Sequence, residues 1–284
     1  MIPASSYLPS VCRIVSLSVR RFSRCVPNSG PFTVPPNVNI DAAAADLPLP
    51  SASCIIEIVQ KESSKADAYP QVHHVDGHPL RVLVSKGSDL RRCVGQGLQL
   101  AAQFKANSAI ALTFGDQPVS DSDAMTAAEV VTVHAYSPST WKKADALKTV
   151  VQSCSILGAS TRAVQLGHDI GNAINMARRL GDLPPNVATP AFMAAHAVQL
   201  CEPSQCGSAK LTCTVLDERD CASLGMNLLL AVGSGSNNPP RVVALEHCPP
   251  GLEDSQPVLL VGKGVTFDSG GISLKPSAKM EVQS

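Results

Sequence analysis

The chain has 284 residues and a mass of 29.6 kDa, which suits one large domain or two modest ones. Hydrophobic residues make up 44% of it and charged residues 16%, so the chain can bury a core. Lys plus Arg and Asp plus Glu number 23 each, and this balance gives no reason to expect nucleic acid or an anionic membrane as a partner. No apolar run reaches the ~18–20 residues that cross a bilayer, so we predict no membrane-spanning segment.

The 10 cysteines are scattered along the chain, and none shows the CxxC spacing of a metal or redox motif. The closest group, Cys201, Cys206 and Cys213, has no histidine at zinc-finger spacing. We therefore expect half-buried, reduced thiols, as in a reducing compartment, rather than a zinc site or a disulfide scaffold.

The first 50 residues are predicted to precede the folded part of the chain. No acidic residue occurs before Asp41, while arginine and serine are frequent, which is the composition of an organellar transit peptide. A disordered N-terminal extension explains the same composition. Proline, asparagine and alanine are frequent from Asn28 to Pro50, which favours a linker. Residues 1–50 are thus interpreted as transit peptide and linker, and a transit peptide would direct the protein to the mitochondrial matrix.

Strand and helix patterns alternate in the next part of the chain. Leu80–Ser85 and Ser108–Phe114 are predicted to be short buried strands, and Asp89 can cap a helix between them. The stretch Ala124–Tyr136 suits a strand by its β-branched residues and a helix by its length and alanines. Leu147–Gln152 is a further strand candidate. This alternation predicts a parallel or mixed sheet covered by helices.

A long helical pattern follows at Ala159–Leu180 and is ended by the double proline at residues 184–185. Thr189-Pro190 is a helix start signal, and Ala191–Leu200 continues that helix. A short helix is predicted around Arg219–Leu224. Four strand candidates surround it: Lys210–Leu216, Asn227–Val232, Arg241–His247 and Pro257–Val261. Because the last three are nearly continuous apolar runs, we expect strands buried on both faces, with the long helix linking two α/β units.

The densest group of chemically useful residues lies between Val258 and Met280. A predicted buried strand ends at Val261 and carries Lys263 to the carboxyl edge of the sheet, where open α/β sheets bind ligands. Because Lys263 directly follows apolar residues, we expect it to be partly buried. Asp268, a Gly-Gly turn and Lys275 follow.

Three kinds of site fit this group. A phosphate loop fails, because Gly262-Lys-Gly264 lacks the third glycine of a dinucleotide loop and no Gly-Lys-Ser/Thr opens a helix. A surface turn with solvated charges stays open, and spacing alone favours it. In a metal site, Asp268 would supply a carboxylate ligand and Lys263 a neutral amine ligand, while Lys275 would face developing negative charge.

Residues 261–275, VGKGVTFDSGGISLK, resemble the signature of the leucyl aminopeptidase (cytosol aminopeptidase) family. Ala177-Arg178 and the PPNVATP segment at 184–190 resemble the start of its catalytic domain. The resemblance is firm from about Ala177 to Met280. It implies an α/β protein with a smaller, macro-like N-terminal α/β domain at 51–155, followed at 156–284 by a linking helix and an incomplete metallopeptidase catalytic domain.

The resemblance also implies a function. The family hydrolyses the first, leucine-type residue from peptides with a free N-terminus by a two-metal mechanism, usually as a cytoplasmic hexamer. The two divalent ions are Mn²⁺ or Zn²⁺, with Mg²⁺ as a further option, and a metal-activated water attacks the peptide bond. By resemblance, Lys263 ligates one metal, Asp268 bridges both, and Lys275 is the catalytic lysine that polarises the scissile carbonyl and stabilises the gem-diolate.

The sequence departs from the family's pattern in two respects. Asp182 replaces the usual asparagine before the double proline, and residues 281–284 do not continue into the family's third metal-binding aspartate or its Asn-Thr-Asp-Ala-Glu-Gly-Arg segment. Lys263 and Asp268 cannot supply the roughly six ligands that each Mn²⁺ or Mg²⁺ ion prefers. We therefore expect a chain truncated within the catalytic domain and inactive alone. The alternative is a non-catalytic truncated paralogue that associates with full-length aminopeptidase hexamers.

Overall fold

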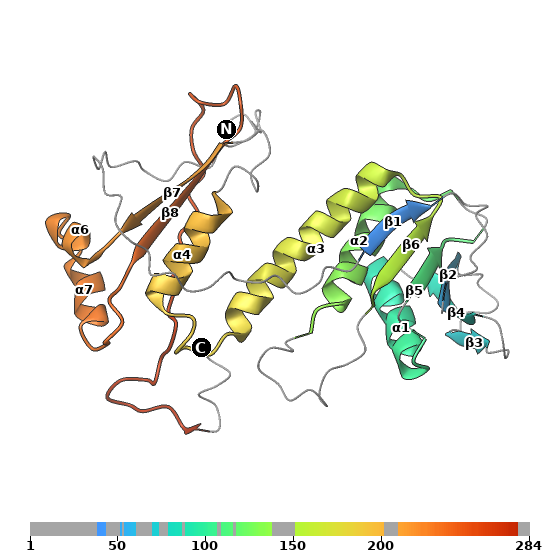
Figure 1. Ribbon diagram of the computed structural model, residues 1–284, viewed down its shortest axis with the longest axis horizontal. Helices are drawn as coiled ribbons and strands as arrows, with labels where there is room; N and C mark the ends of the chain where they lie inside the picture. The colour runs from blue at the N-terminus through green and yellow to red at the C-terminus, as the bar shows by residue number, and fades with distance from the viewer. Residues whose placement is uncertain are drawn as a thin grey trace, which may run out of the picture. The chain divides into compact units, whose positions relative to one another are not determined.

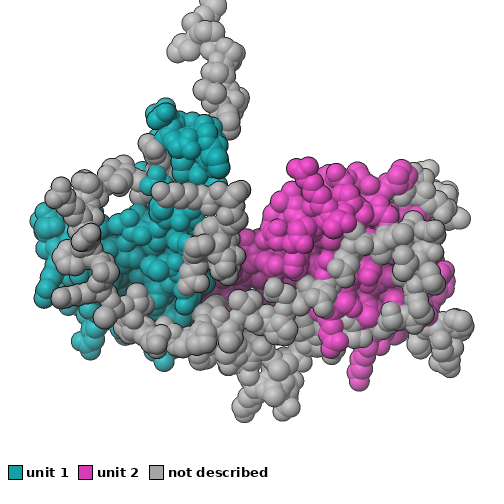
Figure 2. All heavy atoms as spheres, turned by 45° about the horizontal axis from the view of Figure 1, so that its top comes forward, with its two compact units in different colours: residues 1–32, 183–284 teal, residues 33–182 magenta. Residues whose placement is uncertain are grey.

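The computed structural model describes residues 39–43, 52, 54–60, 70–73, 79–86, 89–106, 109–115, 118–137, 151–201 and 210–277. The chain divides into two compact units, which Figure 2 colours separately. One comprises residues 33–182, here called the first unit, and the other comprises residues 1–32 and 183–284, the second unit. The predicted transit peptide lies outside the described residues. None of the helices described is both long and apolar enough to cross a membrane.

The first unit is built on a six-stranded mixed sheet with the order β1-β6-β5-β2-β4-β3 (Figure 1). Its strands are β1 Asn39–Ala43, β2 Cys54–Gln60, β3 Gln71–His73, β4 Leu80–Lys86, β5 Ala109–Thr113 and β6 Ser153–Leu157. All neighbouring strands pair in parallel except β3, which is antiparallel to β4. The prediction of a parallel or mixed sheet within an α/β fold is confirmed.

Three helices cover this sheet: α1 Leu90–Gln103, α2 Asp121–His134 and α3 Thr161–Asp182. Helix α1 begins as predicted, because the Asp89 carboxylate accepts a hydrogen bond from the backbone N–H of Arg91 at 3.0 Å. The ambiguous stretch at 124–136 is helical up to His134, and its buried alanines and Val131 recur at helical spacing. The core joins these helices to the strands, and its largest fully buried side chains are Ile56, Ile58, Leu80, Leu98, Leu112 and Ile156, with four valines.

Two predictions for this unit are wrong in position. The predicted linker contains strand β1, whose Ile40 lies opposite Cys154 of β6. Its sequence NIDAA has little strand propensity, so the pairing with β6 outweighs local preference. The strand expected at Leu147–Gln152 lies instead at Ser153–Leu157, while residues 147–150 are outside the described part of the chain.

Helix α3 packs tightly against α2. A Cβ atom on Gly171 would lie 2.5 Å from Cβ of Thr132, so only glycine fits at this crossing. Asn175 is buried beside it and donates a hydrogen bond of 2.8 Å to the carbonyl of Thr132. The first unit ends with this helix, at Asp182. The predicted domain boundaries, at residues 50/51 and 155/156, stay predictions, because a division into compact units does not test them.

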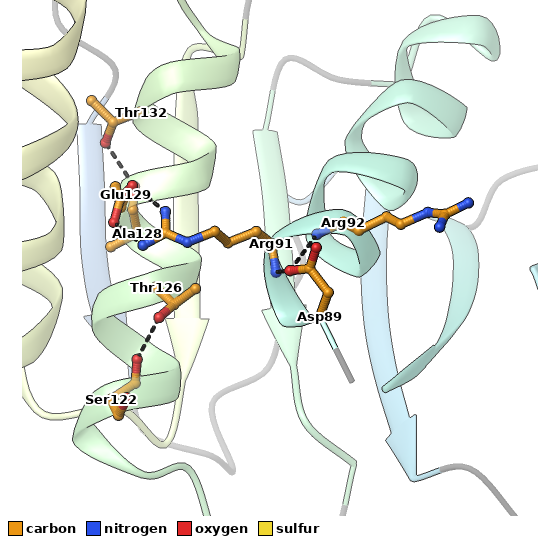
Figure 3. Close-up of polar contacts among 8 residues, drawn as sticks. All are labelled: Asp89, Arg91, Arg92, Ser122, Thr126, Ala128, Glu129 and Thr132. Carbon is orange, nitrogen blue, oxygen red and sulfur yellow. Dashed lines mark hydrogen bonds and ion pairs between the residues drawn. The ribbon is translucent and has the colours of Figure 1, made fainter. Parts of the chain in front are cut away.

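An ion pair joins α1 to α2 (Figure 3). The Arg91 guanidinium donates to both carboxylate oxygens of Glu129, and its Nη2 lies 2.8 Å from Oε2. Glu129 is 7% exposed, whereas 55% of the Arg91 side chain is exposed. The neighbouring Arg92 points away from α2 (Figure 3). Arg91 therefore compensates a carboxylate that is buried in the unit.

The second unit contains α4 Pro190–Leu200, β7 Lys210–Leu216, α6 Glu218–Ser223, α7 Asn227–Gly233 and β8 Val242–Cys248. Strands β7 and β8 form an antiparallel pair, and α4 packs against both (Figure 1). Helix α4 starts as predicted, because Oγ1 of Thr189 accepts a hydrogen bond from the N–H of Phe192 at 3.2 Å. The capping box at Asp217 and Asp220 similarly starts α6.

Two strand predictions for this unit are wrong. Residues 227–232 form helix α7, in which Leu228 and Val232 are 88% and 80% exposed. A short apolar run does not by itself separate helix from strand, and leucine and alanine favour the helix. Residues 258–261 form no strand, and their exposure rises from 40% at Val258 to 86% at Val261. A strand needs a hydrogen-bonded neighbour, and β7 and β8 are the only strands among the described residues of this unit.

Candidate functional site

The three residues singled out by the sequence lie on one segment of the second unit, downstream of Val261. Lys263 is exposed there, so the expectation that it is partly buried is wrong. The reason is that the apolar residues before it do not join a sheet that would cover them. Asp268 is also exposed, whereas Lys275 is half-buried.

The structure brings two of the three residues into contact. Nζ of Lys275 donates a hydrogen bond of 3.0 Å to Oδ2 of Asp268, and the backbone N–H of Gly270 donates one of 2.9 Å to Oδ1. Both carboxylate oxygens of Asp268 thus accept a hydrogen bond. The bond from Lys275, followed by the bond from Gly270, holds the pKa of Asp268 below its ordinary value. Lys263 adds a smaller lowering of this pKa through its charge.

A closed turn positions this pair. The backbone N–H of Lys275 donates to the carbonyl of Ser269 at 2.9 Å, which folds the chain back on itself. Gly270 has φ +100°, and a Cβ atom there would lie 2.4 Å from the carbonyl oxygen of Ser273. The neighbouring Gly271 also has positive φ, but a Cβ atom there would meet nothing within 4 Å. Gly270 is therefore required for both its conformation and its space.

The donors of this segment match a divalent metal site in kind but not in number. Asp268 offers a carboxylate and Lys263 an amine, and both oxygens of the carboxylate already accept hydrogen bonds. Across the described parts of the chain, no group of three His, Cys, Asp or Glu residues could hold a metal ion. Since Mn²⁺ or Mg²⁺ takes about six donors, these residues do not by themselves fit two ions.

Lys275 is the group best placed for chemistry on a substrate. An ammonium group has three N–H donors, so the bond to Asp268 leaves donors that can interact with a carbonyl oxygen or an oxyanion. Asp268 fixes the position of this cation without burying it completely. The segment can therefore present a fixed positive charge beside a carboxylate.

A second polar group, in the first unit, was not predicted. The Tyr136 hydroxyl donates a hydrogen bond of 2.6 Å to Oδ2 of Asp182, the residue that departs from the family's asparagine. The Arg178 guanidinium lies 4.4 Å from the centre of the Tyr136 ring. Burial and the bond to Asp182 raise the pKa of Tyr136 to about 12. No motif marks this group, because Tyr136 follows α2 whereas Arg178 and Asp182 lie far along the sequence in α3.

Comparisons with known proteins relate the chain to peptidases. The sequence model of the cytosol aminopeptidase family, catalytic domain, matches residues 175–284. A probable cytosol aminopeptidase of Nitrosospira multiformis is 46% identical over 123 residues, which cover 43% of this chain and 23% of that protein.

Two solved structures resemble the fold. The bottromycin maturation enzyme BotP in complex with Mn matches with a TM-score of 0.59 and 27% identity, covering 80% of this chain and 51% of that chain. A mutant of tomato leucine aminopeptidase matches with a TM-score of 0.66 over 83% of this chain and 55% of that chain, and its 19% identity supports the fold alone. The chain thus spans about a quarter of the Nitrosospira multiformis protein and about half of each of the two solved structures. Residues 175–284 resemble part of the catalytic domain of the cytosol aminopeptidase family.

Proposed function

We propose that the protein acts as a metal-dependent aminopeptidase that removes the N-terminal, leucine-type residue from peptides. The observation that carries this proposal is the contact between Lys275 and Asp268 within a loop that has the family's signature. Their 3.0 Å ion pair holds a cation and a carboxylate side by side, as a peptidase site that binds metal and an oxyanion requires.

Lys263 and Asp268 are proposed as metal ligands. The Mn in the similar BotP structure supports a divalent ion, which would be Mn²⁺ or Zn²⁺, with Mg²⁺ as a further option. The lysine amine must lose its proton to bind metal. Two such ions need more ligands than these two residues provide, so we propose that residues 1–284 alone are inactive.

Lys275 is proposed as the catalytic residue. Its ammonium would donate a hydrogen bond to the scissile carbonyl oxygen and offset the negative charge that develops there. The partly covered position of Lys275, with 21% of its side chain exposed, strengthens this interaction relative to a fully solvated lysine.

Domain organisation, oligomeric state and localisation are proposed by similarity to the family. We propose a macro-like N-terminal domain at 51–155, a linking helix and part of the catalytic domain at 156–284, and assembly into hexamers. The relatives are named cytosol aminopeptidases, which favours the cytoplasm. The mitochondrial alternative, which rests on residues 1–50, gains no support from them.

A second function stays open: a non-catalytic paralogue that associates with hexamers of a full-length aminopeptidase. The donor set of the described loop favours it, because one carboxylate and one amine are too few for two ions. Large apolar side chains near the site, including Leu260, Val261 and Ile272, are also exposed and could be covered by another polypeptide.

One assay separates the two functions. The purified chain is tested for Mn²⁺-dependent hydrolysis of leucyl-p-nitroanilide, alone and together with any full-length aminopeptidase that co-purifies with it. Turnover that is lost in Lys263→Ala and Lys275→Ala, but not in Lys210→Ala on β7, supports the catalytic function. Turnover by the purified chain alone would contradict the proposal that residues 1–284 are inactive by themselves. Co-purification of an active aminopeptidase whose turnover is unchanged by Lys275→Ala in this chain supports the second function.

A further inference from the structure

Two cysteines of the second unit lie on facing surfaces of α4 and β7. Along β7, Leu211, Cys213 and Val215 are at least partly buried while the threonines between them are exposed, so Cys213 belongs to the apolar face of the strand. Helix α4 packs against β7. The apolar face of β7, which includes Cys213, is therefore available to pack against α4.

Cys201 ends α4 and belongs to the helix face that is buried. It follows Ala197, a buried residue, by four positions, which places the two side chains on one side of the helix. The Cys201 thiol lies 3.5 Å from the carbonyl oxygen of Ala197, to which it donates a hydrogen bond. Cys201 and Cys213 are both half-buried, so small molecules in solution can reach them.

The two thiols contact each other. A side-chain hydrogen bond joins Cys213 to Cys201, and burial together with this neighbour raises the pKa of Cys213 to about 11. Each thiol therefore has a second thiol beside it that can react with it once it is oxidised.

We propose that Cys201 and Cys213 form an oxidation site, in which a hydroperoxide converts the two thiols into a disulfide between the end of α4 and β7. In the first step the sulfur of one cysteine attacks the peroxide oxygen, giving a sulfenic acid and releasing water or an alcohol. In the second step the sulfur of the other cysteine displaces hydroxide from the sulfenic acid, forming the S–S bond and releasing water. Overall, two thiols lose two electrons and two protons to the peroxide, and a dithiol reverses the change.

Other described cysteines are less suited to this reaction. Cys54, Cys93, Cys154 and Cys221 are buried, which shields them from the oxidant. Cys248 is also half-buried, but it lies opposite Lys210 in the strand pair, three positions from Leu245, which lies opposite Cys213. Cys248 therefore provides a matched control on the neighbouring strand. The site is independent of the proposed peptidase function, since it uses none of that function's residues.

The test is a peptide map of the whole chain after graded treatment with hydrogen peroxide. Remaining thiols are blocked with N-ethylmaleimide, and trypsin then yields one peptide with Cys201 and another, residues 211–219, with Cys213. We expect these two peptides to be joined, with the loss of two hydrogen atoms, at a dose that leaves the methionines unoxidised. Dithiothreitol should separate them.

Three controls make the assignment specific. Cys206 lies in the same tryptic peptide as Cys201, so the link must persist in Cys206→Ser and in Cys248→Ser, and must vanish in Cys213→Ser. The disulfide between Cys201 and Cys213 should also be the main product in the folded wild-type chain but not in the chain unfolded by urea. Because this comparison uses no variant, it stays valid if one of the variants does not fold. A disulfide from Cys213 to any other cysteine would overturn the proposal. The proposal would also fail if Cys201 and Cys213 both still reacted with N-ethylmaleimide after a peroxide dose high enough to oxidise methionine.

Discussion

Lys275 and Asp268 form an ion pair with 3.0 Å between Nζ and Oδ2, so the proposed catalytic cation and the proposed metal ligand neutralise each other. A metal ion that binds Asp268 would bind an oxygen that already accepts one hydrogen bond, from Lys275 at Oδ2 or from Gly270 at Oδ1. A metal ion at Oδ2 would lie beside the Lys275 ammonium, whose positive charge opposes its binding. This relationship makes the loop testable without any turnover of substrate.

The first prediction concerns the turn that holds this pair. Gly270→Ala places a methyl group 2.4 Å from the carbonyl oxygen of Ser273 and forces the turn to open. The hydrogen bonds to Asp268 are then lost, and its pKa should rise toward the usual value for aspartate. Gly271→Ala is the matched control, because it imposes the same positive-φ strain without a contact. Carboxyl ¹³C NMR titration measures the pKa of Asp268 in both variants. Equal values in Gly270→Ala and Gly271→Ala would refute the role of Gly270.

The second prediction concerns the pH dependence of the ion pair. Because the folded-state pKa of Asp268 is lowered, chiefly by Lys275, the pair is fully present above the unfolded-state pKa of aspartate. It is lost as the pH falls through the lowered folded-state pKa. Lys275→Gln should therefore raise the pKa of Asp268, while Lys263→Gln should raise it less. A larger effect from Lys263 in the same NMR titration would contradict the geometry.

The third prediction concerns the ion pair between α1 and α2. Arg91→Ala leaves the buried carboxylate of Glu129 without its guanidinium, which should lower the free energy of unfolding by about 2 kcal/mol. Arg92→Ala on the same helix removes an exposed arginine that points away from α2, and should change stability by less than about 0.5 kcal/mol. Urea denaturation followed by circular dichroism compares the two. Equal losses would show that Glu129 does not depend on Arg91.

The fourth prediction concerns the close crossing of α2 and α3. Gly171→Ala would place its Cβ atom 2.5 Å from Thr132, so the helices must separate, at a cost of about 1–3 kcal/mol. Gly95→Ala, within α1, meets nothing within 4 Å and should instead stabilise the protein by up to ~1 kcal/mol. The two variants should move the urea midpoint in opposite directions. A stabilising Gly171→Ala would mean that the helices are not in contact at this position.

Local signals in the sequence predicted the helices and several strands well. The caps at Asp89 and Thr189 and the strand at Lys210–Leu216 are confirmed, because a cap or an alternating pattern acts within a few residues. The sequence did not reveal strand β1, whose existence depends on pairing with β6, more than 100 residues later. The run Pro257–Val261 was predicted to be a strand, but a strand needs a hydrogen-bonded neighbour as well as a pattern, and residues 258–261 form none.

For the candidate site, too, local patterns predicted some features, and contacts between distant residues determined the others. The sequence predicted a carboxylate and two lysines on one loop, and the structure adds that the turn at Gly270 joins Asp268 to Lys275 while Lys263 stays exposed. Burial of Lys263 could not be judged from the residues before it, because burial depends on which elements cover them. The contact between Tyr136 and Asp182 was likewise invisible to any local pattern.

The most direct test of the proposed metal site is Mn²⁺ titration of the ¹⁵N-labelled chain, followed by paramagnetic broadening of its amide signals. Signals around Lys263 and Asp268 should broaden first, and Asp268→Asn, which removes the charge at nearly constant shape, should abolish this preference. Asp254→Asn, at an exposed carboxylate in the preceding loop, should leave it intact. Broadening that is uniform, is centred on other carboxylates, or survives Asp268→Asn would contradict the assignment of this loop to metal.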